Sequence, residues 1–323
     1  MDSVLKREWH VACKADELNT EKPIGISIMG HRVVVWRDTE GVYAWDDLCI
    51  HRGMRLSLGK VCEAKHLECP YHGWKYDGTG QCVSIPAHPD VKIPSKARAR
   101  AVYQAVEHAG LVWINLSDNP KPPPTIEEHG DASFRTVTSG PFHLNGSGPR
   151  AIENALDVAH FPFVHGGYLG SVEHPVIEDY QVEKTEDAIY ARNVRVYQPD
   201  PDGNGVGQDV SYDYGILAPL TMYFVKQVED DKRLSILFSL RPESETESVG
   251  YFSTMMNYDH DTPSEEIDRF HSFLLEQDRL IVENQRPELL PMDLSAELHL
   301  RSDAMSIAYR QWLKEIGLSF GTE

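Results

Sequence analysis

The sequence contains no apolar run that approaches the roughly 18 residues of a membrane-spanning helix. Residues 1–14 mix charged and apolar side chains, so the apolar core of a secretion signal is missing too. Positive charge is scarce, because 31 Lys and Arg stand against 50 Asp and Glu, which gives a formal net charge of −19. Such an acidic chain is poorly suited to bind nucleic acid or an anionic membrane surface.

Cysteine is sparse as well, since the 323 residues contain only five. Their spacing is not that of a disulfide-stapled secreted scaffold. Two belong to the motifs described next, and we interpret Cys13, Cys62 and Cys82 as reduced thiols of a cytoplasmic protein. A bridge between Cys62 and Cys82 is the alternative. The length suggests two domains, each with its own core.

Two short stretches carry paired sulfur and nitrogen ligands. Cys49 and His51 are separated by one residue, Cys69 and His72 by two, and 17 residues lie between the pairs. Structural zinc sites usually pair their cysteines, whereas each half here supplies one thiolate and one imidazole. A Rieske [2Fe–2S] cluster needs this set, because two histidines replace two cysteines on one of its irons. A zinc knuckle is the alternative.

The residues around both pairs resemble the Rieske signature. Arg52-Gly53 follows the first pair and Gly73-Trp74 the second, which gives Cys-x-His-Arg-Gly and Cys-Pro-Tyr-His-Gly-Trp. Glycines let backbone N–H groups approach the cluster sulfurs, where hydrogen bonds tune the reduction potential. The resemblance implies that the two cysteines and two histidines of these motifs bind a [2Fe–2S] cluster.

Residues 1–118 are expected to form an all-β domain, because short runs rich in Val, Ile, Tyr and Trp alternate with turn signals. Residues 119–124 include three consecutive prolines and predict a stiff, extended linker. We expect strands at 24–29, 31–36, 42–45, 102–106 and 111–116, with a turn at Ala109-Gly110.

Residues 125–323 are expected to form a second domain, which makes the whole chain α+β. From 176 to 258, consecutive strands with short links predict an antiparallel sheet. Helices are predicted at 149–161, at 263–285 and within 296–316, the second capped by Thr262 and the third ended by Gly317. Helices packed on one antiparallel sheet form an α+β domain.

The predicted helix at 149–161 carries Asn154, Asp157 and His160 at intervals of three residues, which places them along one face. Pro162 should distort or end this helix and let His165 return beside His160. Two histidines and one carboxylate, with open coordination positions, form the facial triad of non-haem Fe(II) oxygenases. A lone pair of histidines is a weak indication, but beside a Rieske motif it predicts a mononuclear iron site.

The helix at 263–285 offers the carboxylate. Asp278 lies in the middle of its apolar face, and a buried unpaired carboxylate is costly unless a metal or a cation compensates it. An ion pair with an arginine is therefore the alternative to metal binding. Glu276 and Glu283 are expected to face water. The apolar face is predicted to comprise Ile267, Phe270, Leu274, Ile281 and Val282.

The whole chain resembles the α subunit of a Rieske non-haem iron oxygenase, in the group that includes dicamba and vanillate O-demethylases. The resemblance rests on the cluster motif, on Asn-x2-Asp-x2-His-x4-His, and on Glu276-Gln277-Asp278. It implies a Rieske domain joined to a helix-grip catalytic domain, usually assembled as a homotrimer. It also implies that His160, His165 and Asp278 bind Fe(II), that Asp157 bridges cluster and iron across a subunit boundary, and that Asn154 lies near the iron.

The same resemblance implies that the protein uses O2 and electrons that a separate ferredoxin or flavin reductase takes from NAD(P)H. The one glycine-rich stretch, 203–207, has no helix after it and is interpreted as a loop rather than a nucleotide site. A basic cluster could dock an acidic electron donor, with a solvated strand edge as the alternative. It consists of Lys92, Lys96, Arg98 and Arg100.

The resemblance implies monooxygenation, that is hydroxylation or O- or N-demethylation, of a small aromatic or alkaloid-like substrate. A cis-dihydroxylating ring dioxygenase is one alternative, although such chains are usually longer and pair with a small β subunit. A Rieske electron carrier without oxygenase activity is another, but it leaves residues 125–323 unexplained. Candidates for the apolar substrate pocket, each also suited to plain core packing, are Phe224, Phe238, Met255 and Phe273.

Overall fold

The computed structural model describes residues 2–186, 188–201, 205–229 and 232–323 and divides the chain into two units. Unit 1 comprises Lys6–Pro123, whereas unit 2 comprises Pro124–Glu323 together with Asp2–Leu5. The Asp2 carboxylate accepts hydrogen bonds from the backbone N–H and the hydroxyl of Ser319, at 3.0 and 2.7 Å. From Asp2 to Leu5 the chain therefore belongs to unit 2, it then passes through unit 1, and it returns to unit 2 between Pro123 and Pro124, within the stretch predicted as a linker.

In the part of the chain that the structure describes, no helix is both long enough and apolar enough to cross a membrane.

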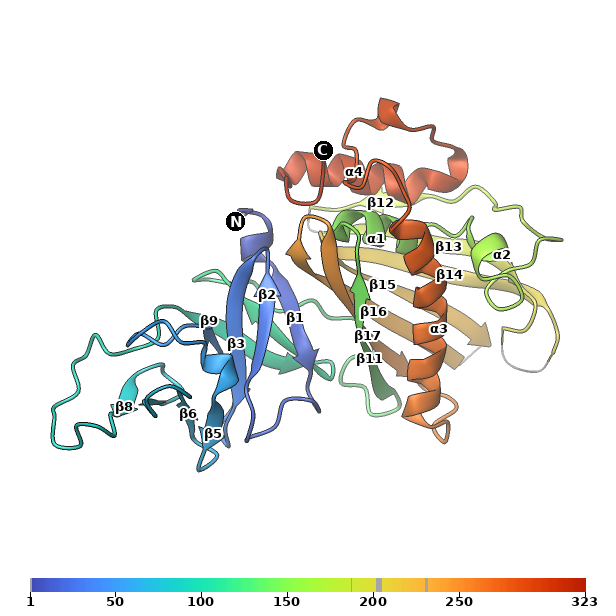
Figure 1. The fold of residues 1–323 in the computed structure, drawn as a ribbon. Coiled ribbons are helices and arrows are strands. Elements are labelled where there is room, and N and C mark those ends of the chain that lie inside the picture. Colours follow the sequence, from blue (N-terminus) through green and yellow to red (C-terminus); the bar gives the residue numbers. More distant parts are fainter. Residues whose placement is uncertain (1, 187, 202–204, 230–231) are drawn as a thin grey trace. The chain divides into compact units, whose positions relative to one another are not determined.

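Unit 1 is built from two antiparallel sheets (Figure 1). The strand order is β1-β10-β9-β4-β3-β2 in one sheet and β5-β6-β7-β8 in the other. The five strands expected from the sequence are confirmed as β2, β3, β4, β9 and β10. The strands are β1 Trp9–Lys14, β2 Ile24–Ile28, β3 His31–Arg37, β4 Val42–Asp46, β5 Lys60–Cys62, β6 His66–Glu68, β7 Lys75–Tyr76, β8 Cys82–Ser84, β9 Val102–His108 and β10 Leu111–Asn115.

The predicted turn between β9 and β10 is confirmed, because Ala109 and Gly110 both have positive φ angles, 52° and 75°. Strand β3 shows how this unit holds its loops. Successive side chains of a strand point to opposite faces. Val33 and Val35 pack into one apolar core, while Val34 and Trp36 pack into a second core that also contains Cys49 and Cys69.

Unit 2 contains one antiparallel sheet of seven strands in the order β11-β17-β16-β15-β14-β13-β12. The predicted sheet is thus confirmed, but the edge strand β11 was not expected, because Gly140-Pro141 interrupts its sequence pattern. Of the stretch 203–207, residues 203 and 204 lie outside the described residues, and no helix opens after it. The strands are β11 Arg135–Leu144, β12 Val182–Lys184, β13 Ile189–Gln198, β14 Gln208–Ala218, β15 Thr221–Glu229, β16 Lys232–Ser244 and β17 Glu247–Met256.

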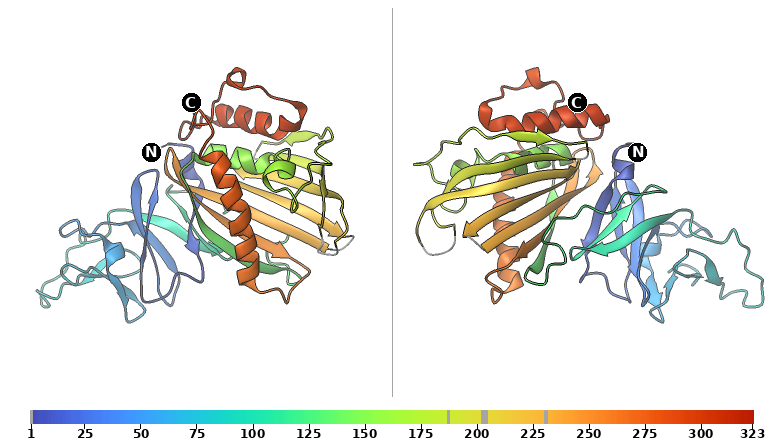
Figure 2. Two further views of the ribbon diagram at one scale, coloured as in Figure 1. Left: turned by 45° about the vertical axis from the view of Figure 1, so that its right-hand side comes forward. Right: turned by 180° about the vertical axis from the view of Figure 1, so that it is seen from behind.

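The long helix α3, Ser264–Val282, lies across one face of this sheet (Figures 1 and 2). Its N-cap is Pro263, so the expected cap at Thr262 is wrong. Helix α4, Ala304–Ile316, lies within the predicted stretch and ends as predicted at Gly317, which adopts φ +76°. Short 3₁₀ helices are η1 Leu5–Arg7, η2 Leu56–Leu58, η3 Leu294–Ala296 and η4 Arg301–Asp303.

The single helix predicted at 149–161 is wrong. Helix α1, Gly148–Leu156, is followed by the four-residue α2, Phe161–Val164. The Asp157 carboxylate accepts a hydrogen bond from the backbone N–H of Ala159 at 2.7 Å. Such a local side-chain bond competes with the helical pattern and ends α1.

Candidate functional site

Two loops of unit 1 present the Cys and His pairs with the same backbone pattern. In each loop, the cysteine N–H donates to the carbonyl five residues later, and the cysteine carbonyl accepts from the glycine four residues later. Gly53 and Gly73 have φ angles of +70° and +67°, which other residues adopt at a cost. The N···O distances are 2.7 Å (Cys49 to Met54), 2.9 Å (Gly53 to Cys49), 2.9 Å (Cys69 to Trp74) and 3.0 Å (Gly73 to Cys69).

The four side chains meet between these loops. The ring centroids of His51 and His72 are 4.5 Å apart, and Trp74 stacks on His51 at 4.5 Å. The Cys49 thiol lies 3.1 Å from the Tyr76 hydroxyl. Its hydrogen bond with the second cysteine, aided by the one with Tyr76, lowers the pKa of Cys49 to about 5 although burial opposes this. A thiolate, the form that binds iron, is therefore favoured at this position.

This donor set fits a [2Fe–2S] cluster. Nδ1 of His51 is buried without a hydrogen-bond partner, and Cys49 and Cys69 are both buried. A bound metal would satisfy groups that the protein otherwise leaves unpaired. His72, in contrast, is exposed, so one edge of the site reaches the surface of unit 1.

The second site lies in unit 2, where the break between α1 and α2 meets α3. Asp157 caps α1 in an extended conformation, so neither it nor His160 continues the helix as the sequence predicts. His160 precedes α2 and His165 follows it. This short helix brings the two imidazole rings to a centroid distance of 5.0 Å.

Asp278 approaches both histidines from α3. Its Oδ1 lies 3.4 Å from Nε2 of His160 and 3.1 Å from Nε2 of His165. One ligand atom from each of the three residues lies within 4.8 Å of the others. Among the described residues, no Lys or Arg forms an ion pair with Asp278, so the alternative of an arginine partner is not found.

The electrostatics of this triad favour a bound cation. Burial lowers the pKa of His160, but Asp157, whose Oδ2 lies 3.4 Å from Nδ1, and Asp278 together raise it to about 9. Burial raises the pKa of Asp278, but His160 and His165 outweigh it and lower that pKa. Nε2 of His160 and Oδ1 of Asp278 are buried without hydrogen-bond partners. Two imidazoles and one carboxylate fit Fe(II) with open coordination positions.

His165 is oriented by a residue to which the sequence analysis assigned no role. Its Nδ1 lies 2.8 Å from Oε1 of Gln277, the residue before Asp278. Because a carbonyl oxygen only accepts, Nδ1 carries the hydrogen and Nε2 keeps its lone pair for a metal. Metal-binding histidines generally donate their other N–H to a nearby acceptor. The side-chain amide of Gln277, next to Asp278 in the sequence, could therefore have been predicted as that acceptor.

The triad opens into an apolar cavity of about 100 Å³, which we call the inner cavity. Phe224, Phe238 and Asn154 line it, as the sequence analysis expects for the first two and for a residue near the iron. An outer cavity of about 380 Å³ continues it. The two cavities share Phe161, Leu169, Phe224, Ile236, His271 and Leu274.

Two other pocket candidates are wrong. Met255 is buried on the opposite face of β17, because its neighbour Met256 lines the outer cavity and strand side chains alternate. Phe273 is 42% exposed, and its ring packs on Tyr168 at 5.1 Å.

Three residues of α3 also need correction. Phe270 and Ile281, both expected on the buried face, are exposed. Glu276 faces water as expected, but Glu283 is largely buried and accepts hydrogen bonds from Asn145 and Arg279. The residues of α3 that line the cavities include His271, which the sequence analysis did not select. It fits the spacing 267, 271, 274, 278, 282, which was visible in the sequence.

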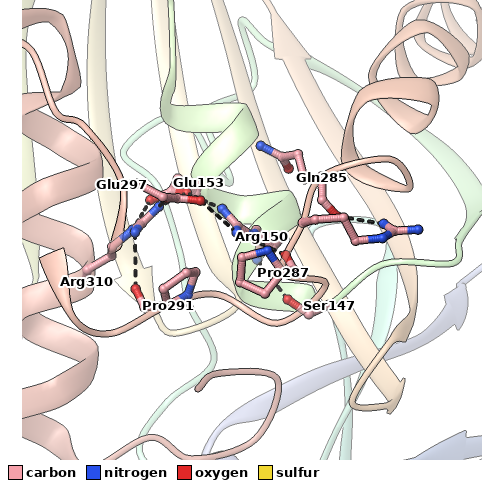
Figure 3. Close-up of polar contacts among 9 residues, drawn as sticks. Ser147, Arg150, Glu153, Gln285, Pro287, Pro291, Glu297 and Arg310 are labelled. Carbon is pink, nitrogen blue, oxygen red and sulfur yellow. Dashed lines mark hydrogen bonds and ion pairs between the residues drawn. The ribbon is translucent and has the colours of Figure 1, made fainter. Parts of the chain in front are cut away.

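A separate polar cluster, the arginine cluster, lies beside α1 (Figure 3). Arg310 donates from Nε and Nη2 to the two carboxylate oxygens of Glu153, at 2.5 and 2.7 Å. Arg150 donates to Glu297 at 2.9 Å, and Arg310 also pairs with Glu297. Both arginines and Glu153 are buried. Two guanidinium groups thus balance two carboxylates.

Comparisons with known proteins cover both units. Residues 8–95 match the Rieske [2Fe-2S] domain, and residues 146–318 match the vanillate O-demethylase oxygenase C-terminal domain. The chain is 27% identical to methylxanthine N1-demethylase NdmA of Pseudomonas putida, over 97% of this chain and 89% of the relative.

Another relative and a solved structure agree with these matches. The chain is 36% identical to the probable methylxanthine N7-demethylase NdmC of Pseudomonas sp. (strain TJI-51), over 66% of this chain and 77% of the relative. The structure of Pseudomonas putida CBB5 NdmA with caffeine superimposes with a TM-score of 0.82 at 25% identity, covering 97% of this chain and 91% of that one.

Proposed function

The chain belongs to the Rieske oxygenases with a vanillate O-demethylase-type catalytic domain, and from this premise we propose that it N-demethylates a neutral, planar heterocycle. As a member of this family it is a non-haem iron monooxygenase with a [2Fe–2S] cluster, and it acts on a small substrate with electrons from a separate reductase. A pure electron carrier is excluded, because the oxygenase domain spans residues 146–318.

The proposal assigns the ligands by residue. Cys49, His51, Cys69 and His72 would hold the cluster, and His160, His165 and Asp278 the iron. Bound there, the two centres supply reduction and activation of O2. Gln277 keeps Nε2 of His165 free for the metal, and the apolar wall of the inner cavity excludes water from the reacting methyl group.

The reaction balances as a monooxygenation. One oxygen atom of O2 enters a C–H bond of the N-methyl group, and the resulting N-hydroxymethyl compound breaks its C–N bond to release formaldehyde. The nitrogen keeps a hydrogen. The other oxygen atom leaves as water, which takes up two protons and two electrons, the electrons supplied by NAD(P)H.

The side chains that line the inner cavity support a neutral substrate. Among the described residues that line it, none is Lys or Arg, and most are apolar. A carboxylate placed there would lack a counter-ion, which is costly in a buried site. The similarity to the methylxanthine N1-demethylase NdmA and to the probable methylxanthine N7-demethylase NdmC supports N-methyl over O-methyl groups.

The direct test is product analysis. The enzyme, reconstituted anaerobically and supplied with a reductase, is expected to contain three irons and two sulfides per chain. It should release one formaldehyde per demethylated N-methylpurine. If only methoxybenzoates yield formaldehyde, the proposed substrate class is wrong.

We also propose that the protein is a homotrimer in which Asp157 receives electrons from the cluster of a neighbouring copy. Exposed apolar side chains in α2 and in the segment that follows it along the chain support an interface there. They are Phe163, Tyr168, Val172 and Val176. Light scattering should then give about three times the chain mass of 36.5 kDa. A monomer at micromolar concentration would contradict the assembly.

The basic cluster of unit 1 supports docking of an acidic electron donor. Its four residues are all exposed, and three of them line a surface groove together with Ile50, which lies between Cys49 and His51. Reversal of two of these charges (Lys96→Glu and Arg100→Glu) should raise the KM for the donor at low salt and leave substrate KM unchanged. An unchanged KM for the donor would contradict docking and would mean that the basic cluster is only a solvated strand edge. The cytoplasmic location stays a prediction, supported by the five cysteines, none of which forms a disulfide.

A further inference from the structure

The imidazole ring of His271 lines both the inner and the outer cavity, away from the metal triad. His271 of α3 is only 5% exposed and belongs to the lining of both the inner and the outer cavity, so it lies where they join. It lies seven positions before Asp278 in the sequence, which corresponds to roughly 10 Å along the helix axis. That interval matches a small bicyclic molecule with one methyl group directed at the triad.

Neighbouring side chains fix the orientation of this ring. Nδ1 of His271 lies 3.0 Å from the hydroxyl oxygen of Ser139, a fully buried residue of β11. The Phe252 ring packs edge-on against the imidazole at 5.0 Å. With Nδ1 engaged, Nε2 is the nitrogen that the ring can offer to a molecule in the cavity.

The ring offers a hydrogen bond and no charge. Burial lowers the pKa of His271 to about 4, against a smaller opposing effect of Asp268. The imidazole is therefore neutral near pH 7 and gives no counter-ion for a carboxylate. In the outer cavity, Lys226 donates to the carbonyl of Pro201 at 2.8 Å, and three acids line the same space. They are Asp200, Asp259 and Glu266.

We propose that His271 is the hydrogen-bonding anchor of the substrate, with Nε2 bound to a carbonyl oxygen or ring nitrogen of a planar bicycle. The anchor sets which methyl group reaches the triad and selects neutral heterocycles over both hydrocarbons and carboxylates. This assignment deepens the N-demethylation proposed above and rests on it for the identity of the reacting group.

Three probes of matched shape test the anchor in the reconstituted holoenzyme without reductase. They are 1-methyl-4-quinolone, 1,4-dimethylnaphthalene, which carries a methyl group in place of the carbonyl oxygen, and 4-methyl-1-naphthoate. Equilibrium dialysis under anaerobic conditions gives each Kd. The wild type should bind the quinolone more tightly than the naphthalene, and the naphthoate most weakly.

Substitution then separates anchoring from shape. His271→Phe should weaken quinolone binding about tenfold, because a buried polar atom loses its partner, and should change naphthalene binding less than twofold. His271→Asn, which keeps an amide donor and acceptor, should recover part of the loss, and Ser139→Ala should fall between wild type and His271→Phe. Melting temperature and iron content report the fold of each variant.

Several results would overturn the anchor. One is an equal loss of affinity for the quinolone and the naphthalene in His271→Phe, which would mean that His271 only packs against the bound molecule. Another is no loss in any variant, and a third is a wild type without preference for the quinolone. If His271→Phe does not fold, the comparison of His271→Asn and Ser139→Ala with the wild type decides by the same criterion. Absence of formaldehyde with this binding pattern intact would count against N-demethylation and leave the anchor in place.

Discussion

The triad site and the arginine cluster both bury acidic side chains beside α1, but they compensate the negative charge differently. In the arginine cluster, Glu153 and Glu297 face two guanidinium groups, so the cluster is neutral as it stands. In the triad site, the side chains that form ion pairs with Asp157 and Asp278 among the described residues are imidazoles, whose charge depends on protonation. A buried acid by itself therefore does not mark a functional site; an unbalanced one does.

The structural consequences differ as well. The arginine cluster connects α1 to α4 and to the segment between α3 and η3, because Arg150 also donates to the carbonyl of Pro287 and Arg310 to that of Pro291 (Figure 3). These contacts need no ligand. The triad site lacks an equivalent set of fixed partners, and a divalent cation would supply the missing positive charge.

The strongest test of this contrast is Asp278→Ala. The mononuclear iron and all turnover should be lost, because two imidazoles alone bind Fe(II) weakly, while the visible spectrum of the [2Fe–2S] cluster remains. Iron analysis should fall from three to two per chain. The matched control is Glu276→Gln on the exposed side of the same helix, which should keep three irons. An Asp278→Ala protein with full iron and turnover would refute the assigned ligand.

Breaking the balanced cluster should act on stability instead. Arg310→Met leaves Glu153 buried without its main partner and should lower the free energy of unfolding by about 3–5 kcal/mol, measured by urea denaturation. The folded fraction should still bind iron.

The control for that variant is Arg301→Met, because Arg301 pairs with Asp179 at the surface. Exposed pairs contribute little, so its effect should stay within about 0.5 kcal/mol. Equal losses for the two variants would mean that the buried cluster has no special weight.

His271 shows a third way to bury an ionisable group, which is to keep it uncharged. Its folded pKa of about 4 lies below the ordinary value of 6.5, so the unfolded chain binds more protons between these pH values. Stability should be fully present above pH 6.5 and lost as the pH falls toward 4, by roughly 3 kcal/mol at most.

The measurement is the free energy of unfolding of wild type and His271→Phe at pH 7.5 and pH 5. The wild type should lose more stability on acidification than the variant, because only the wild type must protonate this ring. Parallel losses in both proteins would show that another group controls the acid response.

The smallest expected effect concerns the second carboxylate of the triad site. Asp157→Asn should leave both metal centres bound but lower turnover about 10- to 100-fold, because Asp157 lies beside His160, a proposed iron ligand, on the proposed electron path. Single-turnover cluster oxidation in the presence of substrate is the measurement. Asp261→Asn, an exposed loop position, is the control. Near-normal turnover in Asp157→Asn would remove the bridging role.

The sequence carried the metal-binding motifs because their residues are close along the chain. Cys49 to His72 and Asn154 to His165 are short segments with fixed chemistry, and Asp278 stands out on an apolar helix face. The arginine cluster had no such local signal, since Glu153 and Arg310 are 157 positions apart. Contacts of that range depend on the finished fold.

Three predictions from the sequence were wrong or incomplete, each for a specific structural reason. Met255 was assigned to the wrong face because β17 is buried on both faces, so its sequence has no alternation to read. The break after Leu156 depends on the hydrogen bond from the backbone N–H of Ala159 to the Asp157 carboxylate. Residues 157–161 themselves include no glycine or proline that would indicate it. Propensity alone predicts continuation there. Edge strand β11 was missed because proline usually argues against a strand.

The path of the chain through the two units has a consequence for dissection of the protein. Asp2–Leu5, which precede unit 1 in the sequence, are part of unit 2. There Leu5 is completely buried, and the Asp2 carboxylate accepts a hydrogen bond from the backbone N–H of Ser319. Unit 1 is thus an insert with two attachments rather than a pendant module. A protease that nicks the proline-rich connector would leave the amino-terminal fragment fastened by these residues, and release of a freely diffusing iron–sulfur fragment would require a second cut near residue 6.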